Sequence, residues 1–377
     1  MPRTVTQDDR KHLVRALDLA ERGRGAVSPN PMVGCVIVKD SGVIGEGWHA
    51  ELGGLHAERA ALADCAERGN DAAGATAYVT LEPCAHEGRQ PPCANALIEA
   101  RVARVVYLSD DPSEKASGRG PGMLRDAGVE VELAQGPEAA AARLHIQPFR
   151  KHARTGRPLV TLKSALTLDG RTATSAGDSK WISGPESRAL VHRWRAEADA
   201  VAIGIGTALA DDALLTARDL DPPALRQPLR VVFDSAARLP AESALAQSAT
   251  EVPVLLITSP GAPPERTDPL NEAGVDVLVV DGDPVARVAA ALAELGRREV
   301  TSLLVEGGAG LAGSFVDVGE VDELRLFVAP ILLGGEGAKP LAGGEGKGRI
   351  ADAERALEVR HEIVGDDLLI TARMKEW

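Results

Sequence analysis

A histidine, a glutamate and two cysteines constrain this sequence more than any other feature. His56 and Glu58 are separated by one residue, and Cys84 and Cys93 follow in the next stretch of the chain. One imidazole and two thiolates are a ligand set that zinc accepts when it keeps its fourth position open for water. Zinc lowers the pKa of bound water to about 7. We therefore predict that His56, Cys84 and Cys93 bind zinc, and that Glu58 carries protons instead of binding the metal.

The residues around these side chains predict how they meet. Residues 57–68 have a helical composition, so His56 and Glu58 fall at the start of a helix. Residues 94–100 form a second predicted helix, which places Cys93 at its N-terminus, where the helix dipole favours a thiolate. The pattern is similar to the H-x-E and P-C-x-x-C motifs of zinc-dependent nucleobase deaminases. Here, however, eight residues separate the cysteines instead of two.

A simpler interpretation of such residues is structural. Cysteines are often buried as small hydrophobic groups, and a single histidine is more often a hydrogen-bonded polar group than a ligand. We expect Cys35 and Cys65 to be core residues of this kind. For His56, Glu58, Cys84 and Cys93, four chemically matched residues at two helix starts favour zinc.

Composition limits the classes of function. A chain of 377 residues predicts two or three domains, and 44% hydrophobic with 26% charged residues is typical of a globular protein. A net charge of −13 and 3% aromatic residues disfavour nucleic-acid binding. Four cysteines do not make a disulfide framework in a chain of this length. No signal peptide and no apolar run that could cross a membrane is visible, so we expect a soluble, cytoplasmic protein without membrane contacts.

The order of predicted elements indicates α/β domains. In the first part, a helix over 6–23 precedes strands over 33–38, 42–48, 77–80, 104–109 and 129–133, with helices between them. Such alternation predicts a sheet covered by helices. A basic run at 149–158 is interpreted as a solvated linker, and a nucleic-acid-binding arm is the less favoured alternative. The predicted boundaries are 1–148 for the first domain, 149–158 for the linker and 159–377 for the second domain.

The second half alternates strands and helices again. Strands are predicted at 159–164, 200–205, 229–233, 254–258, 275–280, 301–305 and 324–328, with helices at 185–198, capped by Ser183, and at 284–297. The strand over 301–305 leads into a G-x-G-x-x-G pattern made of Gly308, Gly310 and Gly313. Small residues at a helix start let backbone N–H groups approach a phosphate. A tight turn without a ligand would explain the glycines equally well, and the pattern does not follow the first strand as in a Rossmann unit.

Three cations in this half could balance a second phosphate. They are Lys163, Arg195 and Arg218, although most single lysines and arginines are ordinary surface cations.

In the first half, prolines on both sides of Asn30 make a rigid loop that presents its amide. We expect Asn30 and Lys163 to contact the substrate.

Taken together, these motifs resemble those of the bifunctional deaminase–reductases of riboflavin biosynthesis over nearly the full length. The first half carries Pro29-Asn30-Pro31, His56-Ala57-Glu58 and a segment from Leu81-Glu82-Pro83-Cys84 through Gly88-Arg89 to Cys93. The second half carries Lys163, Leu168-Asp169-Gly170-Arg171, Trp181-Ile182, Ala210-Asp211-Asp212 and Val305-Glu306. The long spacing between the cysteines separates this pattern from that of tRNA and cytidine deaminases.

The resemblance implies a fold and two activities. The fold would be a cytidine-deaminase-like three-layer α/β/α domain followed by a dihydrofolate-reductase-like α/β domain. The first domain would use zinc to hydrolyse the 2-amino group of 2,5-diamino-6-(5-phosphoribosylamino)pyrimidin-4(3H)-one. The second would use NADPH to reduce the ribosyl group to ribityl. The partners would be this phosphorylated pyrimidine and further copies of the chain in a homo-oligomer.

The resemblance also implies site residues in the second domain. Cofactor contacts are expected from Ala165, Trp181, Thr207, Asp211, Ser235, Gly308, Ala309, Gly310, Leu311, Ala312, Gly313 and Ser314. Substrate contacts are expected from Ser179, Arg195, Leu215, Arg218 and Glu306.

Three other functions compete with this one. A deaminase acting on tRNA or single-stranded DNA would need a basic, aromatic-bearing groove, which the net charge disfavours. A zinc protein without catalysis would have no need of Glu58 beside an open metal position. A third alternative keeps the deaminase but gives the second domain a pterin or another carbonyl substrate.

Overall fold

The computed structural model describes residues 5–85, 91–113 and 117–377. Two compact units divide the chain: Met1–Thr155 together with Trp377, and Gly156–Glu376. Among the described residues, no helix combines the length and apolar character needed to cross a bilayer.

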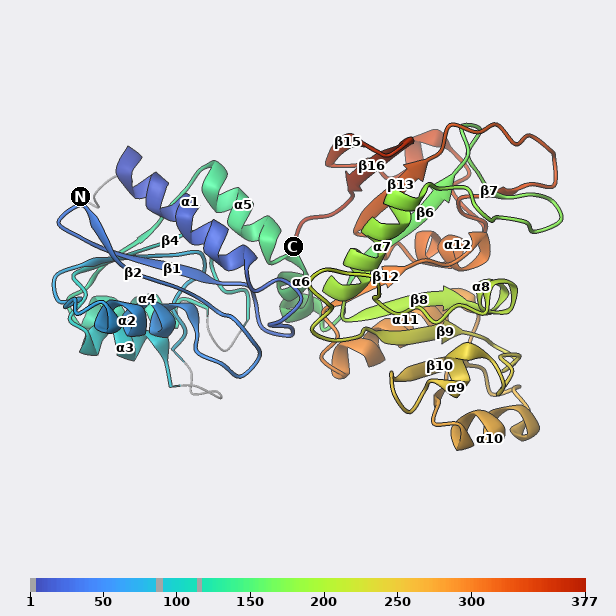
Figure 1. The fold of residues 1–377 in the computed structure, drawn as a ribbon, viewed down its shortest axis with the longest axis horizontal. Helices are drawn as coiled ribbons and strands as arrows, with labels where there is room; N and C mark the ends of the chain where they lie inside the picture. The colour runs from blue at the N-terminus through green and yellow to red at the C-terminus, as the bar shows by residue number, and fades with distance from the viewer. Residues whose placement is uncertain (1–4, 86–90, 114–116) are drawn as a thin grey trace. The chain divides into compact units, whose positions relative to one another are not determined.

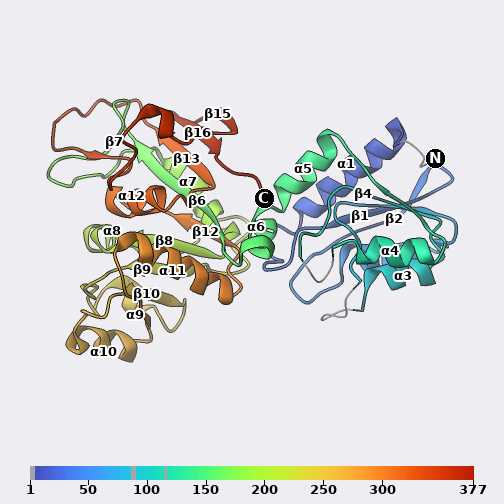
Figure 2. The same ribbon diagram turned by 180° about the vertical axis from the view of Figure 1, so that it is seen from behind.

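The first unit has three layers around a five-stranded sheet (Figures 1 and 2). The strand order is β2-β1-β3-β4-β5; β1 is antiparallel to both β2 and β3, while β3, β4 and β5 are parallel. The strands are β1 Gly34–Lys39, β2 Gly42–Trp48, β3 Thr76–Val79, β4 Arg104–Tyr107 and β5 Glu130–Leu133. The helices are α1 Gln7–Glu21, α2 Ala57–Glu67, α3 Cys93–Glu99, α4 Arg119–Asp126, α5 Pro137–His145 and α6 Gln147–Thr155.

Alternation along the strands explains the layers. Val36, Val38 and Tyr78 pack in one cluster with residues of α1 and α5. Their neighbours Cys35 and Ile37 pack in a second cluster with residues of α2, α3 and α4. Because successive side chains of a strand point to opposite faces, both faces of the sheet are buried. The predicted α/β/α fold and the structural role of Cys35 and Cys65 are confirmed.

Two glycines fix the helix that carries the predicted zinc residues. A Cβ atom at Gly47 would lie 2.3 Å from the backbone nitrogen of Ala61, and one at Gly45 would lie 2.4 Å from the Ala61 carbonyl oxygen. Side chains at either position would push α2 away from β2. The depth of α2 on the sheet, and with it the place of His56, therefore depends on these two positions.

The second unit is built on a nine-stranded sheet. The order is β11-β10-β9-β8-β12-β6-β13-β16-β15; the pairs from β11 to β13 are parallel, and β16 and β15 add antiparallel strands. Its strands are β6 Leu159–Leu166, β8 Ala200–Gly204, β9 Leu229–Phe233, β10 Val254–Thr258, β11 Asp276–Val279, β12 Ser302–Val305, β13 Glu323–Val328, β15 Glu358–Val364 and β16 Asp367–Arg373. A separate pair joins β7 Arg171–Ala173 to β14 Lys339–Pro340. The helices are α7 Pro185–Glu197, α8 Ile205–Asp211, α9 Ala244–Gln247, α10 Pro264–Glu272, α11 Pro284–Arg297 and α12 Ala309–Asp317, with a 3₁₀ turn at Ile350–Asp352.

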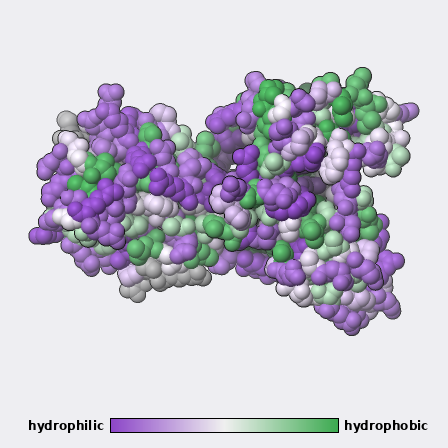
Figure 3. Space-filling model, viewed as in Figure 1, coloured by the Kyte–Doolittle hydropathy of each residue, from purple (hydrophilic) through white to green (hydrophobic). Residues whose placement is uncertain are grey.

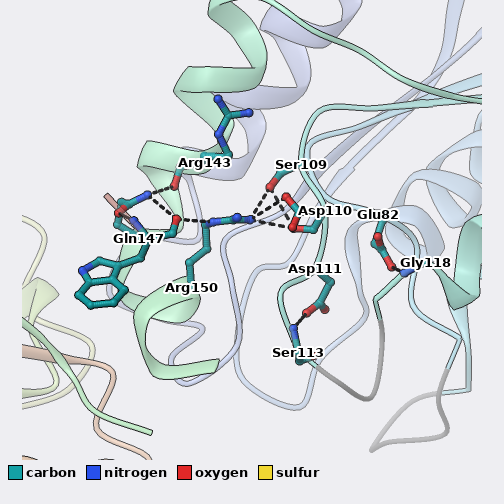
Figure 4. Close-up of polar contacts among 10 residues, drawn as sticks. Glu82, Ser109, Asp110, Asp111, Ser113, Gly118, Arg143, Gln147 and Arg150 are labelled. Carbon is teal, nitrogen blue, oxygen red and sulfur yellow. Dashed lines mark hydrogen bonds and ion pairs between the residues drawn. The ribbon is translucent and has the colours of Figure 1, made fainter. Parts of the chain in front are cut away.

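The predicted linker at 149–158 is wrong for most of its length. Residues up to Thr155 belong to α6, and Arg150 and Lys151 are only 2% and 1% exposed. The Arg150 guanidinium donates to the hydroxyl of Ser109 (2.9 Å), to the carbonyl (2.9 Å) and carboxylate (3.1 Å) of Asp110 and to the carbonyl of Trp377 (2.6 Å) (Figure 4). A basic sequence predicts solvent exposure, but here several acceptors balance the buried cation. Trp377 consequently belongs to the first unit, not to the predicted second domain at 159–377.

A second correction concerns the start of α7. The N-cap is Gly184, not Ser183, and the helix start is tied to β16. The Asp367 carboxylate accepts hydrogen bonds from the Gly184 backbone N–H at 2.8 Å and from the Ser187 hydroxyl at 2.5 Å. An acceptor from a distant strand replaces the local cap that the sequence suggested. The strands β15 and β16 were themselves not predicted.

A buried ion pair fastens α1 to the first sheet. Asp9, in the first turn of α1, accepts hydrogen bonds from the Tyr78 hydroxyl at 2.6 Å and from Arg104 at 2.7 Å. Thr6 completes a capping box with Asp9. Burial alone would raise the pKa of Asp9, but Arg104, Tyr78 and Thr6 together hold it well below its ordinary value.

We predict that Asp9→Asn destabilises the first unit by about 3 kcal/mol, because the buried guanidinium of Arg104 loses one of its two close carboxylate partners and keeps only Glu132. Calorimetry should show the melting temperature of this unit lowered by roughly 5–10 °C. Since the folded-state pKa lies below the ordinary value of 3.8, the contribution of Asp9 is complete above that pH and is lost as the pH falls further. The difference between the variant and the wild type should therefore shrink in acid. The exposed neighbour Asp8, changed to Asn, serves as a control, and an equal effect of both changes would contradict this role of Asp9.

Candidate active sites

The three predicted zinc ligands lie together in the first unit. The ligand atoms of His56, Cys84 and Cys93 all lie within 4.8 Å of one another. The Nδ1 atom of His56 is 3.7 Å from Sγ of Cys84 and 3.5 Å from Sγ of Cys93. Two thiols and one imidazole at this spacing can close around a single ion, and their chemistry suits zinc.

Local structure explains how distant residues reach this point. His56 is the N-cap of α2, and Cys93 is the first residue of α3. Arg59 of α2 donates to the carbonyl of Pro91 at 3.2 Å and to that of Pro92 at 3.4 Å, which ties the segment before α3 to α2. The Cys93 backbone N–H points at Sγ of Cys84 at 3.3 Å. The prediction that two helix starts face one another is confirmed. The motif residues Gly88 and Arg89 lie outside the described residues.

The thiol pair is arranged to carry negative charge. A hydrogen bond from the Cys93 thiol, with a further one from His56, lowers the pKa of Cys84 to about 4. The same hydrogen bond raises the pKa of Cys93, because it keeps the shared proton on that sulfur. A divalent cation held by both sulfurs would favour their deprotonated form, since coordinated thiols are deprotonated.

Glu58 meets the requirements of a proton carrier. Its side chain lies in the first turn of α2 and is only 4% exposed. Burial, and then the charge of Cys84, raise the pKa of Glu58 to about 7. A carboxyl group with this pKa can accept and release a proton near neutral pH.

A second histidine, His49, supports the site and was missed by the sequence analysis. His49 is buried beside His56, with ring centroids 5.3 Å apart. Its Nδ1 atom lies 3.0 Å from the Leu55 carbonyl, which can only accept, so Nδ1 carries the proton. Its Nε2 atom must then accept from the Asn30 amide at 3.1 Å. This hydrogen bond orients the Asn30 side chain and leaves the side-chain carbonyl oxygen of Asn30 for another donor. The only signal in the sequence was a histidine directly after a strand.

The second unit contains a cleft of about 1540 Å³. This exceeds the usual volume of a site for one small ligand, so it can hold a dinucleotide and a substrate together. Most of the predicted site residues of this unit line it: Lys163, Ala165, Ser179, Trp181, Arg195, Thr207, Asp211, Leu215, Arg218, Ser235, Glu306, Gly308, Ala309, Gly310, Leu311 and Ser314. Lys180, Arg188, His192 and Arg287 also line the cleft and were not predicted.

Two predicted cofactor residues do not line the cleft. Ala312 is completely buried in the core, and a Cβ atom at Gly313 would lie 2.4 Å from the backbone of Gly343. Both lie on the side of α12 that packs inward, so the third glycine of the pattern serves packing. The first glycine, Gly308, is the N-cap of α12 and donates its N–H to the Thr207 hydroxyl at 3.2 Å. The start of α12 is thus the part of the pattern that faces the cleft.

Lys163, Arg195 and Glu306 form a charged group in the lining of the cleft. Arg195 of α7 makes two hydrogen bonds with the Glu306 carboxylate, at 2.7 and 2.9 Å, and Lys163 lies 3.9 Å from the same carboxylate. Burial by itself would raise the pKa of Glu306. Arg195, and then Lys163, outweigh this effect and lower the pKa below its ordinary value, so the carboxylate stays ionised. Burial lowers the pKa of Lys163, and Glu306 opposes that shift. The charge of Arg195 is therefore already balanced within the protein.

The fold and the two sites define a class: a two-domain α/β enzyme with a zinc-dependent deaminase site and a separate reductase cleft. Comparison with known proteins agrees. Residues 6–109 match the cytidine and deoxycytidylate deaminase zinc-binding region, and residues 158–369 match the RibD C-terminal domain. The riboflavin biosynthesis proteins RibD of Actinobacillus pleuropneumoniae and Escherichia coli are each 40% identical, over 97% and 96% of this chain and 95% and 98% of their own length.

Solved structures show the same similarity. The RibD structure from Acinetobacter baumannii, form 1, superposes with a TM-score of 0.86 at 38% identity and covers 98% of this chain and 99% of that one. A diaminohydroxyphosphoribosylaminopyrimidine deaminase/5-amino-6-(5-phosphoribosylamino)uracil reductase from Thermotoga maritima gives 0.84 at 34% identity, with coverages of 98% and 99%. The chain belongs to the RibD family of bifunctional deaminase/reductases of riboflavin biosynthesis.

We predict that Glu58→Gln keeps zinc but reduces deamination by roughly 10²–10⁴-fold, because the amide cannot carry a proton. Metal analysis of the purified variant and an assay of released ammonia measure the two effects. Glu67→Gln, on an exposed part of the same helix, is the matched control. Deamination by Glu58→Gln at nearly the wild-type rate would show that another group carries the proton.

Proposed function

We propose that the first unit hydrolyses the 2-amino group of 2,5-diamino-6-(5-phosphoribosylamino)pyrimidin-4(3H)-one and that the second unit reduces the ribosyl group of the product to ribityl with NADPH. Support comes above all from the ligand atoms within 4.8 Å of one another beside the buried Glu58. The cleft that gathers the predicted cofactor and substrate residues supports the second step.

In the deaminase step, zinc would be held by His56, Cys84 and Cys93 and, when bound, would activate water as a Lewis acid. Glu58 accepts a proton from the attacking water and passes it to the leaving amine. The oxygen gives its second proton to the adjacent ring nitrogen and becomes a carbonyl as the C–N bond breaks and ammonia leaves. Asn30, held by His49, presents its carbonyl oxygen as an acceptor for a donor on the pyrimidine.

In the reductase step, NADPH would supply a hydride to C1′ of the ribosyl group, the bond from C1′ to the ring oxygen would break, and that oxygen would take up a proton. The start of α12 offers backbone N–H groups to the cofactor's phosphates. The group of Lys163, Glu306 and Arg195 offers donors and acceptors to the ribosyl hydroxyls. Arg218 suits the substrate phosphate better than Arg195, because its side chain is half exposed and its nearest acid, Asp219, is 3.7 Å away. Ser179 and Leu215 complete the substrate contacts.

We also propose that the protein forms a homo-oligomer and is cytoplasmic. The outer strand β15 offers the surface for self-association: Val359 and Ile363 are 59% and 71% exposed. Figure 3 shows hydrophobic surface gathered over β15 and β16. No described residue pairs with the outer edge of β15, and such an edge is a template for another strand.

The sequence of β15 suits a second copy of the same strand. Val364 pairs with Asp367 across the hairpin, so residues 359, 361 and 363 direct their backbone N–H and C=O groups to the open edge. An antiparallel pair centred on His361 would place Arg360 of one copy opposite Glu362 of the other, and Val359 opposite Ile363. The strand is therefore complementary to itself in charge and in apolar contacts.

We predict that Arg218→Ala raises the KM for the deaminated phosphoribosyl substrate roughly 10- to 100-fold, because a charged hydrogen bond to phosphate is lost. NADPH oxidation with this substrate and with dihydrofolate measures the effect and separates the proposed substrate from a pterin. Arg193→Ala, exposed on α7 outside the cleft, is the control. Oxidation of NADPH with dihydrofolate alone would overturn the proposed reductase substrate.

We predict that Ile363→Lys converts the oligomer into a smaller species in light scattering after size-exclusion chromatography, because a charge replaces an apolar contact. Leu225→Lys, at a loop position that is even more exposed than Ile363, should leave the mass unchanged. Arg360→Glu should weaken association and the additional change Glu362→Arg should restore it. A monomeric wild type, or an unchanged mass of Ile363→Lys, would contradict this surface.

A further inference from the structure

The part of the reductase cleft formed by β9, β10 and α11 has a composition that the group of Lys163, Glu306 and Arg195 does not explain. Its lining residues are Phe233, Asp234 and Ser235 at the end of β9, Ile257 of β10, and residues of α11. The α11 residues are Pro284, Arg287 and Val288. Apolar side chains here can cover a base, and Arg287 is the cation that α11 contributes to the lining.

Asp234, the acid at the end of β9, has its carboxylate buried within the protein. Its Oδ2 atom accepts the Leu239 backbone N–H at 2.8 Å. Its other oxygen lies 3.8 Å from Arg238. In dinucleotide sites, an acid at the end of a strand binds the ribose 2′-hydroxyl and favours NADH, whereas a nearby arginine accommodates the 2′-phosphate of NADPH. In this cleft the carboxylate of Asp234 is buried, whereas Arg287 is part of the lining.

Arg287 is placed to meet an anion. It lies in the first turns of α11 and donates to the Gly282 carbonyl, which fixes the guanidinium near the helix start. It makes no ion pair with any carboxylate of residues 5–85, 91–113 and 117–377. Asp283 is used as the N-cap, where it accepts the Ala286 N–H at 2.8 Å. The positive charge of Arg287 thus has no fixed carboxylate partner in this part of the protein.

We propose that Arg287, together with the Ser235 hydroxyl, forms a subsite for a phosphate monoester, the 2′-phosphate of the cofactor, and that it sets the preference for NADPH over NADH. The guanidinium donates to the phosphate oxygens and the serine hydroxyl adds a neutral donor. Backbone N–H groups at the start of α12 remain for the pyrophosphate. The inference rests on the NADPH-dependent reductase proposed above and adds the residue that recognises the cofactor's distinguishing group.

Binding to the full-length protein tests this without turnover. Calorimetry should compare adenosine 2′,5′-bisphosphate with adenosine 5′-monophosphate, which lacks only the 2′-phosphate. The wild type should bind the bisphosphate roughly 10- to 100-fold more tightly. Arg287→Ala should bring the ratio of the two affinities close to one. Its affinity for the monophosphate should stay within about twofold of the wild-type value, because the monophosphate lacks the group that Arg287 contacts. Arg287→Lys should give an intermediate ratio, because it keeps a point charge without the planar fork.

Arg297→Ala is the matched control, because Arg297 lies on the same helix outside the cleft lining. The ratio of kcat/KM for NADPH and NADH should follow the binding ratio in every variant. A wild-type preference for the 2′-phosphate that Arg287→Ala retains would overturn the subsite while leaving the NADPH assignment intact. A wild type that oxidises neither cofactor with the deaminated substrate would overturn the proposed reductase itself, and the inference with it.

Discussion

The deaminase site depends on two helices, α2 and α3, whose N-termini lie close together. His56 precedes α2 and Cys93 opens α3, so the ligands sit where each helix exposes unpaired N–H groups and partial positive charge. Contact of α2 with β2 at Gly45 and Gly47 fixes its depth on the sheet, and the hydrogen bonds of Arg59 hold the segment before α3. Ordinary packing thus brings together two thiols and an imidazole that would otherwise cost conformational entropy to assemble.

In the reductase cleft, a buried carboxylate is stabilised by neighbouring cations. A largely buried Glu306 is tolerated because Arg195 binds it through two hydrogen bonds and Lys163 lies nearby. The group keeps polar atoms in the lining of the cleft, and its two cations share one carboxylate. Cations without such partners, Arg218 and Arg287, lie elsewhere in the lining and are better suited to recognising phosphates.

Residue identity and spacing carried the prediction of the first site further than that of the second. Zinc chemistry restricts ligands to a few residue types, so His56, Glu58, Cys84 and Cys93 could be selected by type. Glycines carry no such restriction. Gly308 faces the cleft while Gly313 packs against Gly343, and the shared pattern gives no way to separate these roles. The basic run at 149–158 misled for a similar reason, because charge predicts exposure unless the chain supplies distant acceptors such as Asp110 and Trp377.

The sequence by itself determined the two α/β domains, the three candidate zinc ligands, Glu58 as the candidate proton carrier and the family, because these depend on local periodicity and on scarce residue types in a fixed order. Only the tertiary structure decided that His49 orients Asn30, that Asp367 rather than Ser183 caps the start of α7, and that the Asp234 side chain is fully buried while Arg287 lines the cleft. These features join residues far apart in the chain or depend on which way one side chain points. The physical reason is that hydrogen bonding and burial are settled by packing in three dimensions, to which the order of residues along the chain gives no direct access.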